Sequence, residues 1–358
     1  MLRGVHMIYD IIIVGAGQAG LTMGYYLKKT NLSFLIIDQC SEIGEVWRTR
    51  YDSLTLFTPR SYSSLPGSKL VGNKNNYPTK DEIADYLAYY VEEHALPVQL
   101  NTIVQILSKE KDSFHITTNQ GLFEAKQIVI ATGPFQKPFI PDCSKLLSKE
   151  IFQIHSAHYK NKDQLKEGSV LVVGGGNSGC QIAVELAEER DVHLSVSKKL
   201  KFLPQDIGGH SIFHWFDKLG ILKATVHSSA GRFLKRQADP IFDKELKALL
   251  KKKQVTLKPR LTSVKDDKLI FQDVSELKAN NIIWSTGFKY DYSWVHIPQA
   301  FHSDGSPVHE RGVTPVNGLY FLGLPWQYRR GSALLQGVGY DASYLYEKIK
   351  ERTLYETE

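Results

Sequence analysis

The sequence predicts an α/β fold with two Rossmann-like dinucleotide-binding domains, the second inserted into the first. Three observations predict it. A strand, glycine turn, helix and second strand occur in residues 9–40 and again in residues 168–199. Each glycine turn has the spacing Gly-x-Gly-x-x-Gly. A short apolar strand ending in Thr-Gly follows each unit, at residues 126–133 and 280–287. One such turn is a weak signal, but two in the same context indicate a duplicated nucleotide-binding unit.

Short apolar runs predict the elements of both units. Residues 11–14 are apolar and β-branched, which is typical of a buried parallel strand. Residues 21–30 predict a helix, and residues 34–37 predict a second buried strand. The second unit repeats this pattern, with strands predicted at 170–173 and 193–196 and a helix at 182–189.

Other periodic segments complete the predicted fold. Helices are expected at residues 80–94 and 243–253, and strands at 98–107, 114–118 and 121–125 form a small antiparallel flap. The chain ends with a predicted strand at 318–324 and a long helix at 332–352. This last pair follows the second unit, so we expect it to return to the first.

The glycines of each turn have separate physical roles. The first permits the tight turn, the second lets the backbone approach a pyrophosphate, and the third lets the helix pack closely on the strand. The pyrophosphate then lies on the free N–H groups of the helix N-terminus. We therefore expect two nucleotide sites, which the following residues provide: Gly15, Gly17, Gln18, Ala19 and Gly20 in the first, and Gly174, Gly176, Asn177, Ser178 and Gly179 in the second.

The end of each second strand distinguishes the two ligands. Asp38 lies 23 residues after Gly15, where a carboxylate can accept hydrogen bonds from the ribose hydroxyls of an adenosine. Ser197, Lys198 and Lys199 occupy the matching place in the second unit, 23 residues after Gly174, and suit a 2′-phosphate. The two sites together indicate FAD and NADPH, with NADH also usable. The alternative interpretation of these lysines is a solvated basic face.

Composition excludes several classes of protein. Apolar residues make up 42%, charged residues 23%, and the net charge is +6, so the sequence indicates a soluble globular protein without a nucleic-acid partner. The three cysteines form no CxxC pair, which excludes a disulfide framework, a cysteine-ligated zinc site and disulfide reduction at the flavin. His155 and His158 lack further ligands, so no metal is expected. No apolar run has the length of a membrane span, and glycines interrupt any signal peptide, which indicates a cytoplasmic protein. A homodimer is left open.

Several motifs resemble the flavin-containing monooxygenases in their short bacterial form. The resemblance covers nearly the whole chain and rests on VGAGQAG, GEVWR, YDSLTLFTPR, YPTKDEIADYL, HSAHYK, VGGGNSG and the two Thr-Gly strand ends. It implies an enzyme, an NAD(P)H-dependent flavoprotein monooxygenase related to the Baeyer–Villiger monooxygenases. It also implies the domain plan: residues 1–137 as the first part of the FAD-binding domain, 138–287 as the NAD(P)H-binding domain, and 288–358 as the return segment with the C-terminal helix.

The resemblance also implies roles for single residues. Val46 and Trp47 would lie along the FAD, and Val104 would present its backbone to the adenine. Thr132 and Gly133 close the first unit, and Gln336 lies in the first turn of the helix that faces the flavin. Phe57 stands where many members have an asparagine beside the flavin. Because phenylalanine cannot donate a hydrogen bond, this departure favours leakage to hydrogen peroxide. Lys149 and Ile151 also depart from the FxGxxxH signature, whose histidine is His155.

The implied activity is oxygenation of a small-molecule substrate by molecular oxygen. The substrate is a soft nucleophile, a sulfide or an amine, or a ketone, and oxygen is transferred from a C4a-hydroperoxyflavin. Two alternatives remain open: an NADPH oxidase or flavin-dependent reductase that passes electrons to oxygen or a quinone, and a nucleotide-binding redox-sensing regulatory module. No residue is expected to act as a catalytic acid or base, because the flavin supplies the chemistry.

Overall fold

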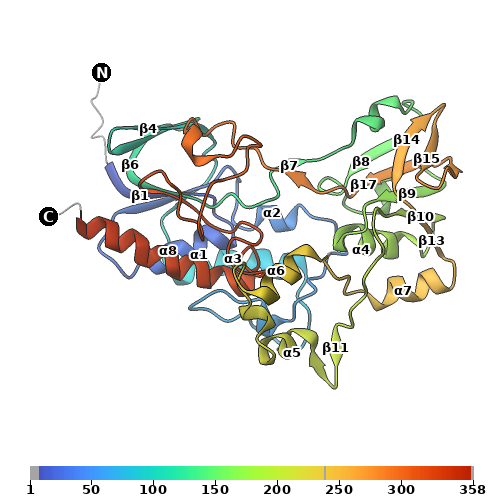
Figure 1. Ribbon diagram of the computed structural model, residues 1–358, viewed down its shortest axis with the longest axis horizontal. Helices are drawn as coiled ribbons and strands as arrows, with labels where there is room; N and C mark the ends of the chain where they lie inside the picture. The colour runs from blue at the N-terminus through green and yellow to red at the C-terminus, as the bar shows by residue number, and fades with distance from the viewer. Residues whose placement is uncertain (1–7, 238, 356–358) are drawn as a thin grey trace.

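The computed structural model describes residues 8–237 and 239–355. It contains one mixed sheet and one parallel sheet with helices packed on them, joined by two crossing chain segments (Figure 1). The first sheet has the order β3-β2-β1-β6-β5-β4, and β19 also pairs with β6. Its strands are β1 (Ile8–Val14), β2 (Phe34–Ile37), β3 (Val98–Gln99), β4 (Val104–Glu110), β5 (Ser113–Thr118), β6 (Gly121–Ile130) and β19 (Leu319–Phe321).

β6 pairs in two ways within the first sheet. Its first half pairs antiparallel with β5, from Gly121 to Ala125, while Ile128 to Ile130 pair parallel with both β1 and β19. The prediction of separate strands at residues 121–125 and 126–133 was therefore wrong. One strand leaves the flap and continues into the buried parallel sheet, so its sequence pattern changes midway.

The segment predicted as one strand at residues 98–107 is broken into β3 and β4. Asn101 between them has φ of 54°, and its N–H donates to the carbonyl of Cys40 at 2.9 Å. The N–H of Thr102 donates to the carbonyl of Asp38 at 2.8 Å. The chain turns here because it passes across the end of β2, beside the predicted ribose-binding carboxylate.

Three helices cover one face of the first sheet: α1 (Gln18–Leu27), α3 (Lys80–Glu93) and α8 (Leu335–Tyr355). α3 begins at a capping box formed by Thr79 and Glu82. α8 lies alongside α1, although the two are at opposite ends of the chain (Figure 1). α8 begins three residues later than predicted, because the Oγ of Ser332 accepts from the N–H groups of Tyr328 and Arg329 and holds a turn there.

The second sheet repeats the plan of the first. It has the order β13-β10-β9-β17-β8, all parallel, and a three-stranded antiparallel sheet beside it. Its parallel strands are β8 (Phe152–His155), β9 (Val170–Val173), β10 (Val192–Ser195), β13 (Val255–Lys258) and β17 (Asn281–Trp284). The flap consists of β14 (Leu261–Lys265), β15 (Lys268–Phe271) and β16 (Glu276–Leu277), and the helices are α4 (Asn177–Leu186) and α7 (Lys244–Lys251). The predicted duplication is confirmed.

Two connections cross between the sheets. They form a short antiparallel pair, β7 (Lys137–Pro138) with β18 (Phe288–Lys289). The chain after β18 then reaches β19, so the last strand and helix return to the first sheet as predicted. No helix within the described residues combines the length and apolar character needed to cross a membrane.

The segment at residues 200–242 reaches from the second unit back to the first, and no sequence pattern predicted its structure. It contains the hairpin β11 (Asp206–Ile207) and β12 (His210–Ser211), followed by α5 (Ile212–Lys218) and α6 (Ser229–Arg236). The N–H of Val226 donates to the carbonyl of Tyr328 at 2.8 Å, and Arg330 pairs with Asp239 at 3.1 Å. We call residues 200–242 the bridging segment.

The remaining short elements are α2 (Glu45–Arg48) and the 3₁₀ helices Arg60–Tyr62, Asp142–Leu146, Lys162–Gln164, Ile221–Lys223 and Pro298–Ala300.

Candidate functional site

The first glycine turn connects β1 to α1 and shows all three expected glycine roles. Gly15 has φ of 113°, and a Cβ there would lie 2.6 Å from the carbonyl oxygen of Ala131. A Cβ at Gly20 would overlap the carbonyl oxygen of Gly15. A Cβ at Gly17 would meet nothing within 4 Å, so the space in front of the helix N-terminus is open. The protein itself therefore does not require glycine at position 17, whereas a closely approaching ligand does.

The second turn, between β9 and α4, has the same construction. Gly174 has φ of 124° and lies against the backbone of Ser285, and a Cβ at Gly179 would overlap the carbonyl oxygen of Gly174. A Cβ at Gly176 would meet nothing within 4 Å. Asn177 and Ser178 begin α4 directly after this open position. In each turn, packing requires the first and third glycines, and the second glycine leaves open space in front of the helix N-terminus. We call the open spaces at Gly17 and Gly176 the first and second cradles.

Asp38 is held beside the first turn by the backbone. One carboxylate oxygen accepts from the N–H of Ala16 at 2.5 Å, and the other accepts from the N–H of Cys40 at 2.8 Å. Each carboxylate oxygen has a second lone pair available for a hydroxyl group. The anchored carboxylate lies at the end of β2, where a ribose on the first turn would present its diol.

The matching position in the second unit is open to solvent. Ser197, Lys198 and Lys199 follow β10 and are exposed, and within the described part of the chain no hydrogen bond or ion pair holds their side chains. No carboxylate stands at this strand end. The position can therefore receive a phosphate, and it offers no acceptor for a bare ribose diol.

The residues that follow each sheet extend the two cradles. Gly133 and Gly287, which end the two Thr-Gly segments, have φ of 66° and 83°, and a Cβ on either would meet nothing within 4 Å. Thr132 accepts from the Nε2 of Gln136 at 3.0 Å. At the first cradle the N-terminal turn of α1 contacts the chain before α8, because Gln18 Nε2 donates to the carbonyl of Ala333 at 3.2 Å. The loop that precedes α8 is thereby brought to the first glycine turn.

Unpaired polar atoms lie at both cradles. Gln336 Oε1 and Ser285 Oγ are buried without a hydrogen-bond partner within the described residues. A buried polar atom without a partner is costly, so such atoms mark places where a ligand supplies the missing bond. Together with the empty space at Gly17 and Gly176, they fit one dinucleotide on each turn. Ala19 is buried in the turn itself, where its methyl group lies close to Gly323.

The residues implied to contact FAD by resemblance lie on several elements. Val46 and Trp47 are in α2, where Val46 is 49% exposed and Trp47 packs against the core under α1. Val104 begins β4 and packs on the other face of the first sheet. These positions remain predictions for cofactor contact.

Phe57 packs against aromatic side chains of the bridging segment. Its ring stacks on Phe242 at 5.3 Å and on Phe213 at 6.2 Å, both from the bridging segment. Tyr62 packs against the same rings. This aromatic cluster, Phe57, Tyr62, Phe213 and Phe242, joins the two units, and no sequence pattern indicated it.

A second set of contacts joins the first unit to α4. Tyr51 Oη donates to Gln181 Oε1 at 2.6 Å, and Gln181 Nε2 donates to the carbonyl of Thr55 at 3.0 Å. Ser53 and Tyr159 both donate to the carboxylate of Glu185. Sequence reasoning gave these residues no role. The one available signal was the i, i+4 spacing of Gln181 and Glu185, which places two polar side chains on one helix face.

His155 occupies the edge of the second sheet as a neutral side chain. Its Nδ1 accepts from the N–H of Ala157 at 3.0 Å, so its Nε2 carries the proton and donates to the carbonyl of Gly287 at 3.0 Å. Burial lowers the pKa of His155, while the hydrogen bond to Gly287 opposes this. Both ring nitrogens of His155 have hydrogen-bond partners.

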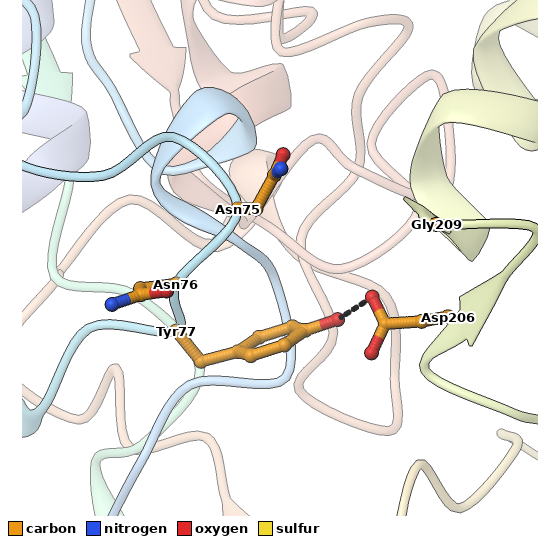
Figure 2. A pocket seen from close by; sticks show the side chains of 5 residues that line it. All are labelled: Asn75, Asn76, Tyr77, Asp206 and Gly209. Carbon is orange, nitrogen blue, oxygen red and sulfur yellow. Dashed lines mark hydrogen bonds between the residues drawn. The ribbon is translucent and has the colours of Figure 1, made fainter.

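One open pocket lies away from the predicted site residues. It has a volume of about 550 Å³ and is lined by Asn75, Asn76, Tyr77, Asp206 and Gly209. Figure 2 shows Tyr77 pointing across it to the hairpin of the bridging segment, where its hydroxyl donates to Asp206 at 2.9 Å. None of the residues predicted to bind a nucleotide lines this pocket.

Known proteins resemble this chain in sequence and in fold. Residues 12–206 match the family model described as pyridine nucleotide-disulphide oxidoreductase. An oxidoreductase of Geobacillus kaustophilus named CzcO-like is 56% identical over 96% of this chain and 98% of its own. The indole-3-pyruvate monooxygenase YUCCA4 of rice is 26% identical over 95% of this chain and 87% of its own. The solved structure of a flavin-containing monooxygenase from Stenotrophomonas maltophilia has a TM-score of 0.81, with 25% identity over 97% of this chain and 100% of that one.

Proposed function

Because the chain belongs to the pyridine nucleotide-disulphide oxidoreductase family, we propose that it is a flavoprotein monooxygenase that uses FAD and NAD(P)H. Its substrate is a small molecule with a soft nucleophilic sulfur or nitrogen, or a ketone. The observation that supports this best is the pair of open glycine turns on one chain, one beside an anchored carboxylate and one beside exposed lysines.

The disulfide chemistry in the family's description does not suit this chain. It has three cysteines, Cys40, Cys143 and Cys180, and none forms a CxxC pair. All three are free thiols, and burial raises the pKa of each, which disfavours the reactive thiolate. Molecular oxygen or another small oxidant is then the remaining acceptor of the electrons.

Each part of the site has a task in this proposal. The first turn binds the FAD pyrophosphate and Asp38 binds its ribose, while the second turn binds the nicotinamide nucleotide. FAD held there would supply the redox chemistry: acceptance of a hydride from the nicotinamide and transfer of one oxygen atom from molecular oxygen to the substrate. Residues 1–137 and 288–358 then form the FAD-binding domain, and residues 138–287 form the NAD(P)H-binding domain.

We assign the second site a preference for NADPH. Lys198 and Lys199 have no ion-pair partner among the residues that the structure describes, and they lie where the 2′-phosphate would bind. The preference is modest, because water and salt screen exposed ammonium groups. NADH remains a usable coenzyme.

Phe57 supports a second candidate function, an NADPH oxidase that releases hydrogen peroxide. Its side chain offers no hydrogen bond, and it is engaged in the aromatic cluster. A regulatory module without turnover is less well supported, because both cradles and Asp38 are intact.

The test is a direct measurement of the electron balance. The purified protein should be yellow, and anaerobic NADPH should bleach it. On admission of oxygen, a panel of sulfides, amines and ketones is assayed for oxygenated product, with peroxide measured in parallel. Product formation matched to NADPH consumption supports the monooxygenase, and peroxide equal to NADPH with every substrate supports the oxidase. A colourless protein, or a yellow one that NADPH does not bleach, contradicts both.

A further inference from the structure

Arg50 is a cation without an anionic partner at the junction of the two units. It follows α2 in the first unit, and its guanidinium lies 4.9 Å from the ring centre of Phe135 and 5.4 Å from that of Phe288. Among the described residues no carboxylate reaches it, and no side-chain hydrogen bond holds it. Arg48, two residues earlier, pairs with both Glu42 and Asp85.

The unpaired state of Arg50 is unusual for a guanidinium in this environment. Burial lowers the pKa of Arg50, which shows that its surroundings disfavour the charge. The guanidinium has five N–H donors in a planar fork, and the faces of the two phenylalanine rings attract the cation but accept little hydrogen bonding. Arg50 is partly buried. Charges withdrawn from water are normally paired, so we expect the missing partner to be an anion that the protein itself does not supply.

The rings that hold Arg50 place it between the two nucleotide sites. Phe135 lies two residues after Gly133, and Phe288 directly follows Gly287. The carbonyl of Gly287 accepts from His155, which is neutral and therefore adds no charge beside Arg50. Ser285, directly after β17, lies against Gly174 of the second glycine turn.

The neighbouring residue connects Arg50 with the helix of the second turn. Tyr51 Oη donates to Gln181 of α4, and its hydroxyl also interacts with Ser178 in the first turn of that helix. The backbone that carries Arg50 is therefore fixed on the helix whose N-terminus would receive a pyrophosphate. The side chain extends from there toward the two Thr-Gly ends.

We propose that Arg50 binds the diphosphate of the nicotinamide nucleotide, at the phosphate nearer the nicotinamide. The first unit thus contributes a binding residue to the site of the second. A planar guanidinium matches a phosphate with two parallel N–H bonds, and the rings on either side preorganise it for that contact. The inference rests on the proposed nicotinamide-nucleotide site at Gly174 to Gly179.

The experiment compares two ligands that differ in the contacted phosphate. NADP⁺ carries the whole diphosphate, whereas adenosine 2′,5′-bisphosphate lacks the phosphate nearer the nicotinamide. Dissociation constants of both are measured on the FAD-loaded wild type, Arg50→Met and Arg50→Lys. Methionine keeps an unbranched apolar stem between the rings. Arg190→Met, which removes an arginine paired with Glu167, is the matched control.

Arg50→Met should weaken NADP⁺ by about ten- to a hundredfold, the range of one charge-assisted contact, and leave the bisphosphate unchanged. Arg50→Lys should restore part of the loss, and Arg190→Met should change neither constant. Unchanged NADP⁺ affinity in Arg50→Met, or an equal loss for both ligands, would overturn the inference. A lower melting temperature without selective loss of NADP⁺ would identify a purely structural stack and would overturn it as well. If wild type binds neither ligand, the proposed nicotinamide site fails together with this inference.

Discussion

A valine at position 17 is expected to leave the protein folded and to remove FAD. The backbone of Gly17 has φ of −78° and ψ of −174°, which any residue adopts, and a Cβ there meets no protein atom within 4 Å. Gly17 caps α1 without a side-chain bond, so a β-branched residue costs about 1 kcal/mol of stability or less. The space that the valine fills is the space that a pyrophosphate needs.

The loss of FAD affinity follows from the contacts that the valine blocks. Each hydrogen bond from a backbone N–H to a charged phosphate contributes about 1.5–3 kcal/mol. Loss of two such bonds weakens binding by about a hundredfold to ten-thousandfold. Gly17→Val should therefore purify with little flavin absorbance per chain, and its melting temperature should lie within about 4 °C of that of wild-type protein stripped of FAD.

Two matched variants make this prediction specific. Gly176→Val places the same side chain in the second cradle, where a Cβ also meets nothing within 4 Å, so it should stay yellow and resist bleaching by NADPH. Gly20→Ala overlaps the Gly15 carbonyl and should lower the melting temperature itself. A fully yellow Gly17→Val, or loss of FAD from Gly176→Val, would refute the assignment of the two turns.

Three further predictions concern the coenzyme, the oxygen reaction and the linker histidine. Lys198→Ala should lower kcat/KM for NADPH by about tenfold at most and leave kcat/KM for NADH nearly unchanged, and this effect should shrink as the salt concentration rises. An equal effect on both coenzymes would instead favour the interpretation of these lysines as a solvated basic face. Phe57→Asn should raise the stopped-flow absorbance of the oxygenated flavin while Phe57→Leu does not, and a long-lived adduct in wild type would show that another group stabilises it. Burial lowers the pKa of His155, so its contribution to stability is complete above pH of about 6.5 and is lost as the pH falls below that value. His155→Gln should flatten the fall in melting temperature between about pH 7 and 5, and an unchanged slope would mean that His155 is not the group that titrates.

The sequence predicts best where local chemistry and the fold agree. The two glycine turns were predictable because Gly15 and Gly174 need positive φ, and Gly20 and Gly179 need room for a neighbouring carbonyl. Each requirement involves residues of a single strand–turn–helix unit, so the spacing of the glycines in the sequence is enough to predict it. The start of α3 was predictable for the same reason, from a capping box on residues three apart.

Contacts between distant segments were not predictable in this way. Arg50 acquires its position from Phe135 and Phe288, which lie far along the chain and have no spacing relation to it. The aromatic cluster brings Phe57 to rings of the bridging segment, whose short elements show no clear period. The break between β3 and β4 depends on carbonyls of Cys40 and Asp38, which the sequence of residues 98–107 does not reveal.

Isotope labelling with ¹⁸O₂ tests the central claim most directly. In a monooxygenase, two electrons from one NADPH and two from the substrate together reduce one oxygen molecule, so that one oxygen atom enters the substrate and the other leaves as water. With a sulfide or ketone that raises NADPH consumption, the product should carry one ¹⁸O atom for each NADPH oxidised, and little peroxide should accumulate. An unlabelled product, or recovery of all consumed oxygen as labelled peroxide across the substrate panel, would contradict the monooxygenase.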